Sequence, residues 1–287
     1  MSDLAATGRR NWLSQPGLRI GIAAALLLLL AGFVSIVWTP HPIDSVNVGA
    51  ALQGFGGTHW LGTDYLGRDL LSLLMKGILA SFIVAAIAVV IGALVGIPLG
   101  LAAASWGGPV EWAILRLTHF MFAFPALIAA ILITALAGPS MVNVMVAVGL
   151  FNIPAFARVA HAGMASFWQR DYVAAARLSG MSGAEVARRH ILPSLVGLLG
   201  AQAVLQLALG IIAEAGLSYV GLGTQPPATS LGLMLKDAQT YAPMQPALVL
   251  VPGIALLLIV VALHLVSDGL RDRLDAPLRQ IGADRAA

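Results

Sequence analysis

The stretch DYVAAARLSGMSGAEVARRHILPS, residues Asp171–Ser194, decides how the fold of this chain is interpreted. It combines a run of three alanines, several basic residues and two glycines, and it lies between long apolar segments. A polar, helix-prone stretch of this length is out of place inside lipid. It therefore predicts a segment that leaves the membrane and has a task outside it.

The composition is that of a membrane protein. Of 287 residues, 59% are hydrophobic and only 10% are charged, and the mean hydropathy is +0.90. A soluble domain has about a quarter charged residues. The chain has no cysteine, which excludes disulfides, thiolate metal ligands and cysteine nucleophiles. The first apolar run is too long for a signal peptide, and no clear cleavage site follows it.

The apolar runs predict six membrane-spanning helices, because a hydrocarbon core about 30 Å thick needs about 20 apolar helical residues. A Gly-Pro pair in Ala137–Ser140 predicts a tight turn between the third and fourth of them. The predicted spans are Ile20–Trp38, Ile78–Ala103, Trp112–Leu136, Val142–Ala162, Leu195–Leu217 and Ala247–Val266.

The basic residues predict the orientation. With the N-terminus inside, thirteen of the 16 lysines and arginines fall in inner segments, and only Arg68, Lys76 and Lys236 fall in outer loops. This bias predicts that both termini and the 171–194 stretch are cytoplasmic. The expected organisation is an N-terminal tail, first helix and outer loop (1–77), a membrane domain of five helices (78–268) containing the polar loop (166–194), and a cytoplasmic tail (269–287).

The polar loop is expected to form a helical hairpin. Ser166–Gln169 and Ser182–Glu185 both fit capping boxes, and Gly180 lies where a helix end favours a left-handed residue. Two short helices are predicted, at about 167–179 and 183–192, with Pro193 at the entry to the fifth span. The hairpin is either a docking element for a cytoplasmic partner or an ordinary solvated loop.

The hairpin resembles the "EAA" loop of ABC-importer permease subunits. Ala175, Ala176, Gly180 and the HILPS exit match that motif, whereas Ala174 stands where the family usually has Glu. In the family this loop couples the membrane helices to a cytoplasmic ATPase. The resemblance implies this role here for Tyr172, Ala174, Ala175, Ala176, Gly180, Glu185, Arg188, His190 and Pro193.

Three further stretches are similar to dipeptide, oligopeptide and nickel permeases. They are His59–Gly77, Glu214–Leu235 and Pro252–Arg279, and in the first of them Leu73 replaces the usual Arg. The resemblance implies an all-α membrane protein with the six-helix ABC importer type I permease fold, in the bacterial inner membrane. It also implies a second permease, two ATPase subunits and an external solute-binding protein as partners besides the lipid bilayer, with nucleic acid not among them. The implied solute is a short peptide, with nickel or another small solute as the alternative.

The chain is not expected to be an enzyme or to bind a cofactor. It has no G-x-x-x-x-G-K-[ST] phosphate loop, so ATP and Mg²⁺ would be held by partner ATPases. The same absence also fits a secondary transporter driven by an ion gradient. The six histidines show no metal-binding spacing, and the acids and serines form no catalytic set, so neither metal ligation nor catalysis is expected.

Polar residues recur every fourth position in the fifth predicted span, at Gln202, Gln206, Gly210 and Glu214. Such residues face the interior of a helix bundle, and an ionisable one is a functional candidate. They predict either a polar translocation path or interhelical hydrogen bonds, with Gly210 permitting close packing. Asn143 and Asn152 raise the same choice, and Pro125 and Pro154 are expected to kink their helices.

The outer loops offer a second surface. Trp60, Asp64, Arg68 and Asp69 are candidates for contact with a solute-delivery protein, with stabilisation of the outer mouth as the alternative. The stretch Gly223–Ser230 cannot be regular helix and is expected to form an irregular outer segment.

Overall fold

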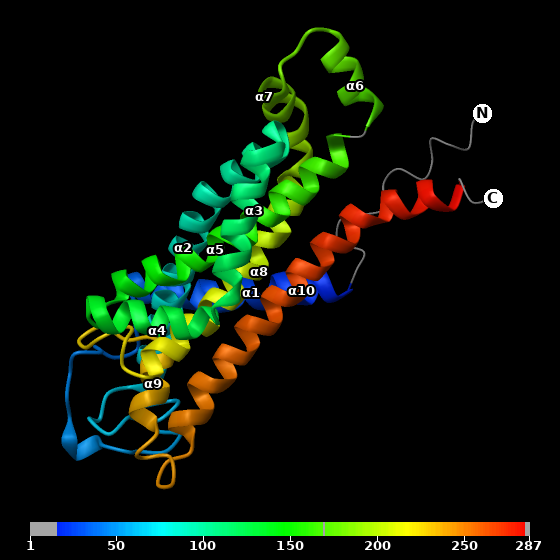
Figure 1. Cartoon of the computed structure of the whole chain (residues 1–287). Coiled ribbons are helices and arrows are strands. Elements are labelled where there is room, and N and C mark those ends of the chain that lie inside the picture. The colour runs from blue at the N-terminus through cyan, green and yellow to red at the C-terminus, as the bar shows by residue number, and fades with distance from the viewer. Residues whose placement is uncertain (1–15, 169, 285–287) are drawn as a thin grey trace, which may run out of the picture.

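The chain folds as an elongated helical bundle (Figure 1). The structure, a computed structural model, describes residues 16–168 and 170–284, and within these ranges it has no strand, only helices and two isolated bridges. The elements are α1 (Pro16–Val37), η1 (Val48–Ala50), α2 (Leu70–Trp106), α3 (Gly108–Ala123), α4 (Ala126–Ala137), α5 (Met141–Trp168), α6 (Asp171–Leu178), α7 (Gly183–Val186), η2 (Ala187–Ile191), α8 (Leu192–Tyr219), α9 (Leu231–Ala238) and α10 (Ala247–Asp284).

Five of the six predicted spans are confirmed as helices long and apolar enough to cross a membrane: α1, α2, α5, α10 and α8 together with η2. The third, expected over Trp112–Leu136 with a kink at Pro125, is interrupted at that proline. It consists of α3 and α4, which meet at an angle of 82°. Phe124 is extended there, because Pro125 disfavours the helical conformation in the residue before it and cannot donate a backbone hydrogen bond.

The centre of the bundle is the contact between α2 and α5. Gly92, Gly96 and Gly100 recur every fourth residue of α2 and face α5. A Cβ atom on any of them would overlap Asn152, the carbonyl of Ile153 or the carbonyl of Ala157, respectively. The glycines therefore let two membrane helices approach at backbone distance, as small residues spaced by four do in lipid.

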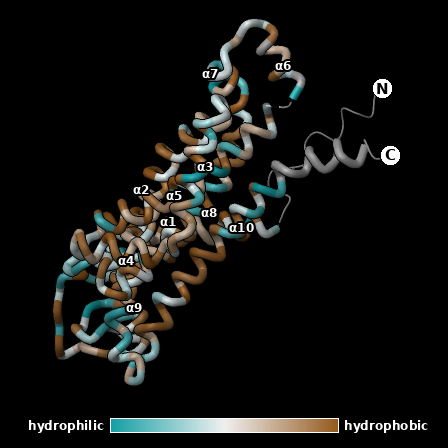
Figure 2. Tube along the Cα trace, in the orientation of Figure 1, coloured by the Kyte–Doolittle hydropathy of each residue, from teal (hydrophilic) through white to brown (hydrophobic). Residues whose placement is uncertain are grey.

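Figure 1 shows the α6–α7 hairpin at one end of the bundle and residues 38–69 with α9 at the other. The α1 helix packs alongside α10, with Gly21 against Leu265 and Leu18 against Gly269. In Figure 2 the membrane-crossing length of α10 is hydrophobic, whereas the loop region beside α9 contains hydrophilic residues. The hairpin and residues 38–69 therefore lie at opposite ends of the bundle, as expected of segments predicted to face opposite sides of the membrane.

Two boundaries differ from the prediction. Helix α2 starts at Leu70 inside the expected outer loop, because Asp69 caps it by accepting a 2.8 Å hydrogen bond from Ser72 N. The second outer segment is irregular over Gly223–Thr229, as expected, but it continues into the unpredicted helix α9. Ser230 caps that helix by accepting a 3.2 Å hydrogen bond from Leu233 N. We call residues 38–69 the outer loop and residues 171–191 the hairpin.

Candidate coupling hairpin, interior polar face and outer loop

The hairpin has the expected left-handed turn, and α7 starts at Gly183 as expected, but α6 starts at Asp171 and not at about Phe167. Gly180 has φ +87° between α6 and α7, which a β-carbon would disfavour. The predicted cap at Ser166 is wrong, because α5 runs on to Trp168 and the Ser166 hydroxyl donates back to the Gly163 carbonyl at 2.9 Å. Gln169 of that box lies outside the described residues. Ser182 does cap α7, accepting a 3.3 Å hydrogen bond from Glu185 N.

The base of the hairpin is fixed to the bundle by apolar contacts. Val173 of α6, Val186 of α7 and Ile191 of η2 are all fully buried. They pack in one cluster with Met164 of α5 and Leu195 of α8. The π-helical turn η2 joins α7 directly to α8, so the hairpin is connected to α8 by continuous helix and to α5 by packed side chains.

The tip of the hairpin is open to solvent. Tyr172 is 42% exposed and Leu178 is 90% exposed, and Ala174 and Ala175 are exposed between them. Ala176 is half-buried and packs against the anchoring cluster. A small-residue face flanked by exposed large side chains suits close contact with a second surface, and sequence reasoning missed Leu178 because a lone leucine carries no pattern.

The remaining hairpin candidates lie nearer the bundle. Glu185 pairs with Arg189 at 3.0 Å on the surface, where such a pair is worth little. Arg188 is exposed, His190 is half-buried, and Pro193 is exposed at the start of α8. Eight of the nine candidates therefore lie on the hairpin, and Pro193 follows it at the start of α8.

The three polar candidates of α8, Gln202, Gln206 and Glu214, are buried, and each has a hydrogen-bond partner. Gln202 accepts a 2.8 Å hydrogen bond from Arg271 of α10. Glu214 is 1% exposed and accepts hydrogen bonds from the hydroxyls of Ser81 and Ser218, both at 2.6 Å, and from Thr224 at 3.3 Å. At these positions the contacts are those of the alternative interpretation, interhelical hydrogen bonding, and Glu214 does not face an open path in this structure.

The two asparagines differ from each other. Asn152 of α5 accepts a 2.9 Å hydrogen bond from Gln206, while its buried Nδ2 has no partner. Asn143 donates to the carbonyls of Ala137 and Gly138 at 3.0 and 2.8 Å, and so closes the C-terminus of α4. Asn152 and Gln206 thus come together between α5 and α8, whereas Asn143 lies apart at the α4–α5 turn.

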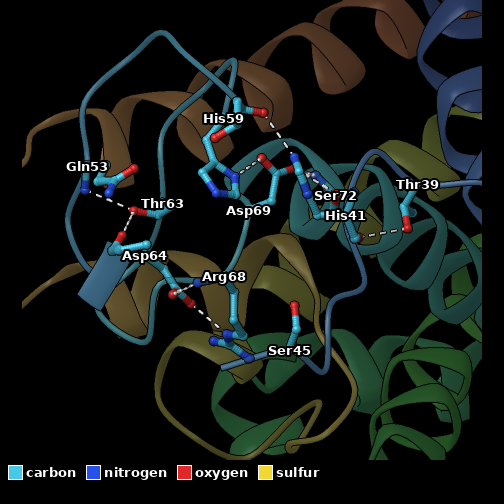
Figure 3. Close-up of polar contacts among 12 residues, drawn as sticks. Thr39, His41, Ser45, Gln53, His59, Thr63, Asp64, Arg68, Asp69 and Ser72 are labelled. Atoms are coloured by element: carbon cyan, nitrogen blue, oxygen red, sulfur yellow. Dashed lines mark hydrogen bonds and ion pairs between the residues drawn. The ribbon is translucent and has the colours of Figure 1, made fainter. Parts of the chain in front are cut away.

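In the outer loop, three of the four candidates are engaged in holding the loop itself (Figure 3). Asp64 accepts from the backbone N–H groups of Leu66 and Arg68 at 2.9 and 2.8 Å and pairs with the Arg68 guanidinium at 2.7 Å. Asp69 caps α2. Trp60 is 65% exposed, so it is the one of these four candidates that presents a large side chain to a partner.

The outer loop is joined to the segment after α9. Tyr65 stacks on Tyr241, with ring centroids 5.0 Å apart and planes 8° from parallel. Asp237 of α9 lies in the same hollow as Asp64, Tyr65 and Arg68. Burial raises the pKa of the Asp237 carboxyl, and the nearby Arg68 guanidinium opposes that rise.

Sequence reasoning missed one cluster entirely. His41, His59 and Asp69 come together in the outer loop, although they are far apart in the sequence and show no metal-ligand spacing. The six histidines show no metal-binding spacing in the sequence, yet two of them lie together in the folded chain. The three residues meet only because the folded chain returns to the same place, and such a return leaves no pattern in the local sequence.

The long apolar helices are those of a multi-pass helical membrane protein, with a polar hairpin between α5 and α8 and a folded outer loop. A sequence model of the family "binding-protein-dependent transport system inner membrane component" matches residues 96–280. The chain belongs to this family, and it is a multi-pass protein of the bacterial inner membrane.

Curated relatives span nearly the whole chain. The glutathione transport system permease protein GsiD of Pectobacterium atrosepticum is 36% identical over 91% of this chain and 88% of its own length. The dipeptide transport system permease protein DppC of Alkalihalophilus pseudofirmus is 33% identical over 94% and 88%, respectively. A chain of the MetNI methionine ABC transporter, solved in inward-facing conformations, matches with a TM-score of 0.55 and 16% identity, over 69% of this chain and 96% of that one. That last likeness shows the ABC permease fold.

Proposed function

We propose that this chain forms half of the translocation path of an ATP-driven importer of short peptides. Its partners would be a second, homologous permease, two cytoplasmic ATPase subunits and an external solute-binding protein. The family description supports dependence on a binding protein. The named solutes of the relatives, dipeptides and glutathione, are both short peptides, whereas these relatives give no support to the nickel alternative.

The observation that carries the proposal is the hairpin. It combines a fully buried base of Val173, Val186 and Ile191 with a tip where Leu178 is 90% exposed. Leu178 offers a large apolar side chain for contact, and burial of such a side chain by a partner contributes about 1.5–3 kcal/mol. The packed base would transmit movement to the bundle, and the exposed tip would receive the partner.

The coupling step requires no covalent chemistry in this chain. Nucleotide and Mg²⁺ would bind to the ATPase subunits, and closure of those subunits would move the hairpin. Because η2 continues into α8 and the hairpin base packs on α5, this movement would tilt both helices. Such coupling exists only if the partner makes different contacts with the hairpin in the two states.

Reconstitution tests the proposal. Proteoliposomes would contain this chain and its second permease, with or without the ATPase subunits, and the solute-binding protein would be loaded with a labelled dipeptide or glutathione. Uptake should require both the ATPases and hydrolysable ATP. Uptake by the permeases alone, driven by a proton or sodium gradient, would contradict it and favour a secondary transporter.

A further inference from the structure

We propose that His41, His59 and Asp69 form a binding site for a divalent transition-metal ion of the zinc type in the outer loop. One candidate ligand atom from each of the three lies within 4.8 Å of the other two. The two imidazole rings have centroids 4.4 Å apart, and Figure 3 shows the Asp69 carboxylate beside the His59 ring. Imidazole nitrogens and a carboxylate oxygen are ligands that zinc uses in proteins.

The hydrogen bonds of the two imidazole rings indicate which nitrogen of each ring would bind the ion. His41 Nε2 lies 2.9 Å from the Thr58 carbonyl, which can only accept, so Nε2 carries the hydrogen and Nδ1 of the neutral ring has the lone pair. His59 Nδ1 lies 3.0 Å from Asp69 Oδ1, a separation that suits two ligand atoms of one ion. On binding, the ion would take the place of the hydrogen between these two atoms, and the neutral His59 ring would carry its hydrogen on Nε2 instead. The His41 ring, held by a carbonyl oxygen on its other nitrogen, has the usual setting of a metal-binding histidine.

The surrounding structure holds the cluster in place. The second oxygen of Asp69 accepts hydrogen bonds from Ser72 N at 2.8 Å and Ser72 Oγ at 2.7 Å. The same Ser72 oxygen accepts a 3.0 Å hydrogen bond from His41 N. Asp69 is 2% exposed and both rings are half-buried, so the groups are positioned by the fold and not by chance contact at the surface.

The donor set selects the class of ion. Calcium and magnesium prefer oxygen ligands, whereas two imidazoles and one carboxylate suit zinc and its neighbours. In tetrahedral zinc the ligand atoms stand about 3.3 Å apart, given bonds of about 2.0–2.2 Å. The ligand atoms, which lie within 4.8 Å of one another, would therefore move closer on binding by rotation of the rings, and water would complete the four ligands.

Such an ion would join three separate parts of the chain. His41 follows α1, His59 lies in the turn that begins at Gly56, and Asp69 begins α2. The ion would thus fasten the outer loop to the end of a membrane helix. This inference rests on the loop geometry alone and is independent of the proposed transport function.

The test is zinc binding to the full-length chain, carrying a tag without histidines, in lipid nanodiscs after treatment with a chelator. Calorimetric titration should give one Zn²⁺ per chain with a Kd in the micromolar range or below. X-ray absorption at the zinc edge should show two imidazole ligands. Wild-type protein that binds no stoichiometric zinc would overturn the proposal.

Variants assign the ion to the cluster. His41→Phe and His59→Gln should each weaken zinc binding by about 100-fold or more, since loss of even an outer-shell partner costs about 10- to 100-fold. His119→Phe, at an exposed histidine of α3, is the matched control and should bind as wild type. Zinc should raise the melting temperature of wild type and of the control but not of His41→Phe. An equal rise in that variant would overturn the site even if calorimetry were ambiguous.

Discussion

At the scale of the residue, Glu214 decides between a path and a packing role for the polar face of α8. Its carboxylate accepts from Ser81 of α2, Ser218 of α8 and Thr224 of the following loop. The Ser81 oxygen in turn accepts a 3.2 Å hydrogen bond from Leu231 N at the start of α9. One buried acid thus ties together two membrane helices and the irregular segment that leads to α9.

We expect Glu214→Leu to destabilise the protein by several kcal/mol, because leaving a buried donor unsatisfied costs about 1–3 kcal/mol and three hydroxyls lose their acceptor. Glu214→Gln keeps one carbonyl acceptor and should lose much less stability. Thermal unfolding of the purified chain in nanodiscs measures both changes. Unchanged stability of Glu214→Leu together with lost uptake would instead place Glu214 on the path.

The Asp237 carboxyl is expected to make the folding stability of the protein depend on pH. Burial raises the pKa of its carboxyl above the usual 3.8, so folding disfavours the ionised form. A carboxyl group whose pKa is higher in the folded protein than in the unfolded chain stabilises the fold most at a pH below its pKa in the unfolded chain. This contribution to stability is lost as the pH rises through its pKa in the folded protein. Asp237→Asn should therefore stabilise the protein at pH 7 relative to wild type, with the gain vanishing as the pH falls to about 4.

The gain should be at most about 0.5 kcal/mol, because Asp237 is half-exposed and screened by solvent. Melting temperatures of both proteins across that pH range check it. Thr240→Ala, at an exposed residue just after α9, serves as a control because the change involves no titrating group. A gain in stability that is the same at every pH would contradict its assignment to the ionisation of Asp237.

At the scale of the element, the hairpin depends on the left-handed turn at Gly180. A valine there would be strained by its β-carbon at φ +87°, at a cost of about 1–2 kcal/mol, or about 5- to 30-fold in an equilibrium. Gly180→Val should weaken co-purification of the ATPase subunits by that factor and lower ATP-coupled uptake. Gly200→Val is the matched control, since Gly200 lies within α8 with open space around it.

Association of the ATPases at wild-type yield in Gly180→Val, with normal uptake, would show that the turn is not needed for coupling. Equal losses in Gly180→Val and Gly200→Val would point to a general effect of valine on folding. The comparison is direct because a β-carbon at either position would meet no other atom within 4 Å.

The sequence predicts elements well where one physical signal is strong. Apolar length identifies α1, α2, α5, α8 and α10, and the preference of glycine for positive φ identifies the turn at Gly180. Pro125 predicts a break, but the 82° angle depends on what α3 and α4 pack against. Helix α9 is missed because its eight residues follow an irregular segment and carry no long apolar run.

The candidate sites are predicted unevenly for a related reason. The hairpin is continuous in sequence, so its motif keeps its residues together. The contacts of Gln202, Gln206 and Glu214 reach α10, α5 and α2, and a single helix pattern cannot choose among these partners. The His41–His59–Asp69 cluster depends wholly on the return of the outer loop to the start of α2.

At the scale of the whole molecule, the bundle separates two exposed docking candidates. Leu178 lies at the hairpin end and Trp60 in the outer loop, and the two ends are opposite in Figure 1. Both side chains are largely exposed, so replacing either should change folding stability by no more than about 0.5 kcal/mol. Effects on function can therefore be assigned to contacts with partners.

We expect Leu178→Ser to reduce association with the ATPase subunits and to leave capture of the solute-binding protein unchanged, with Trp60→Ala doing the reverse. Distant, independent sites add within about 0.3–0.5 kcal/mol, so the double variant should show additive losses when each association is measured without nucleotide. With bound ATP the two ends should become coupled, because a partner that changes the affinity of the chain for the other partner has its own affinity changed by the same factor. Pull-down titrations of wild type, the two single variants and the double variant, with and without a non-hydrolysable ATP analogue, measure whether the losses are additive. Additive losses under both conditions would contradict transmission through the bundle.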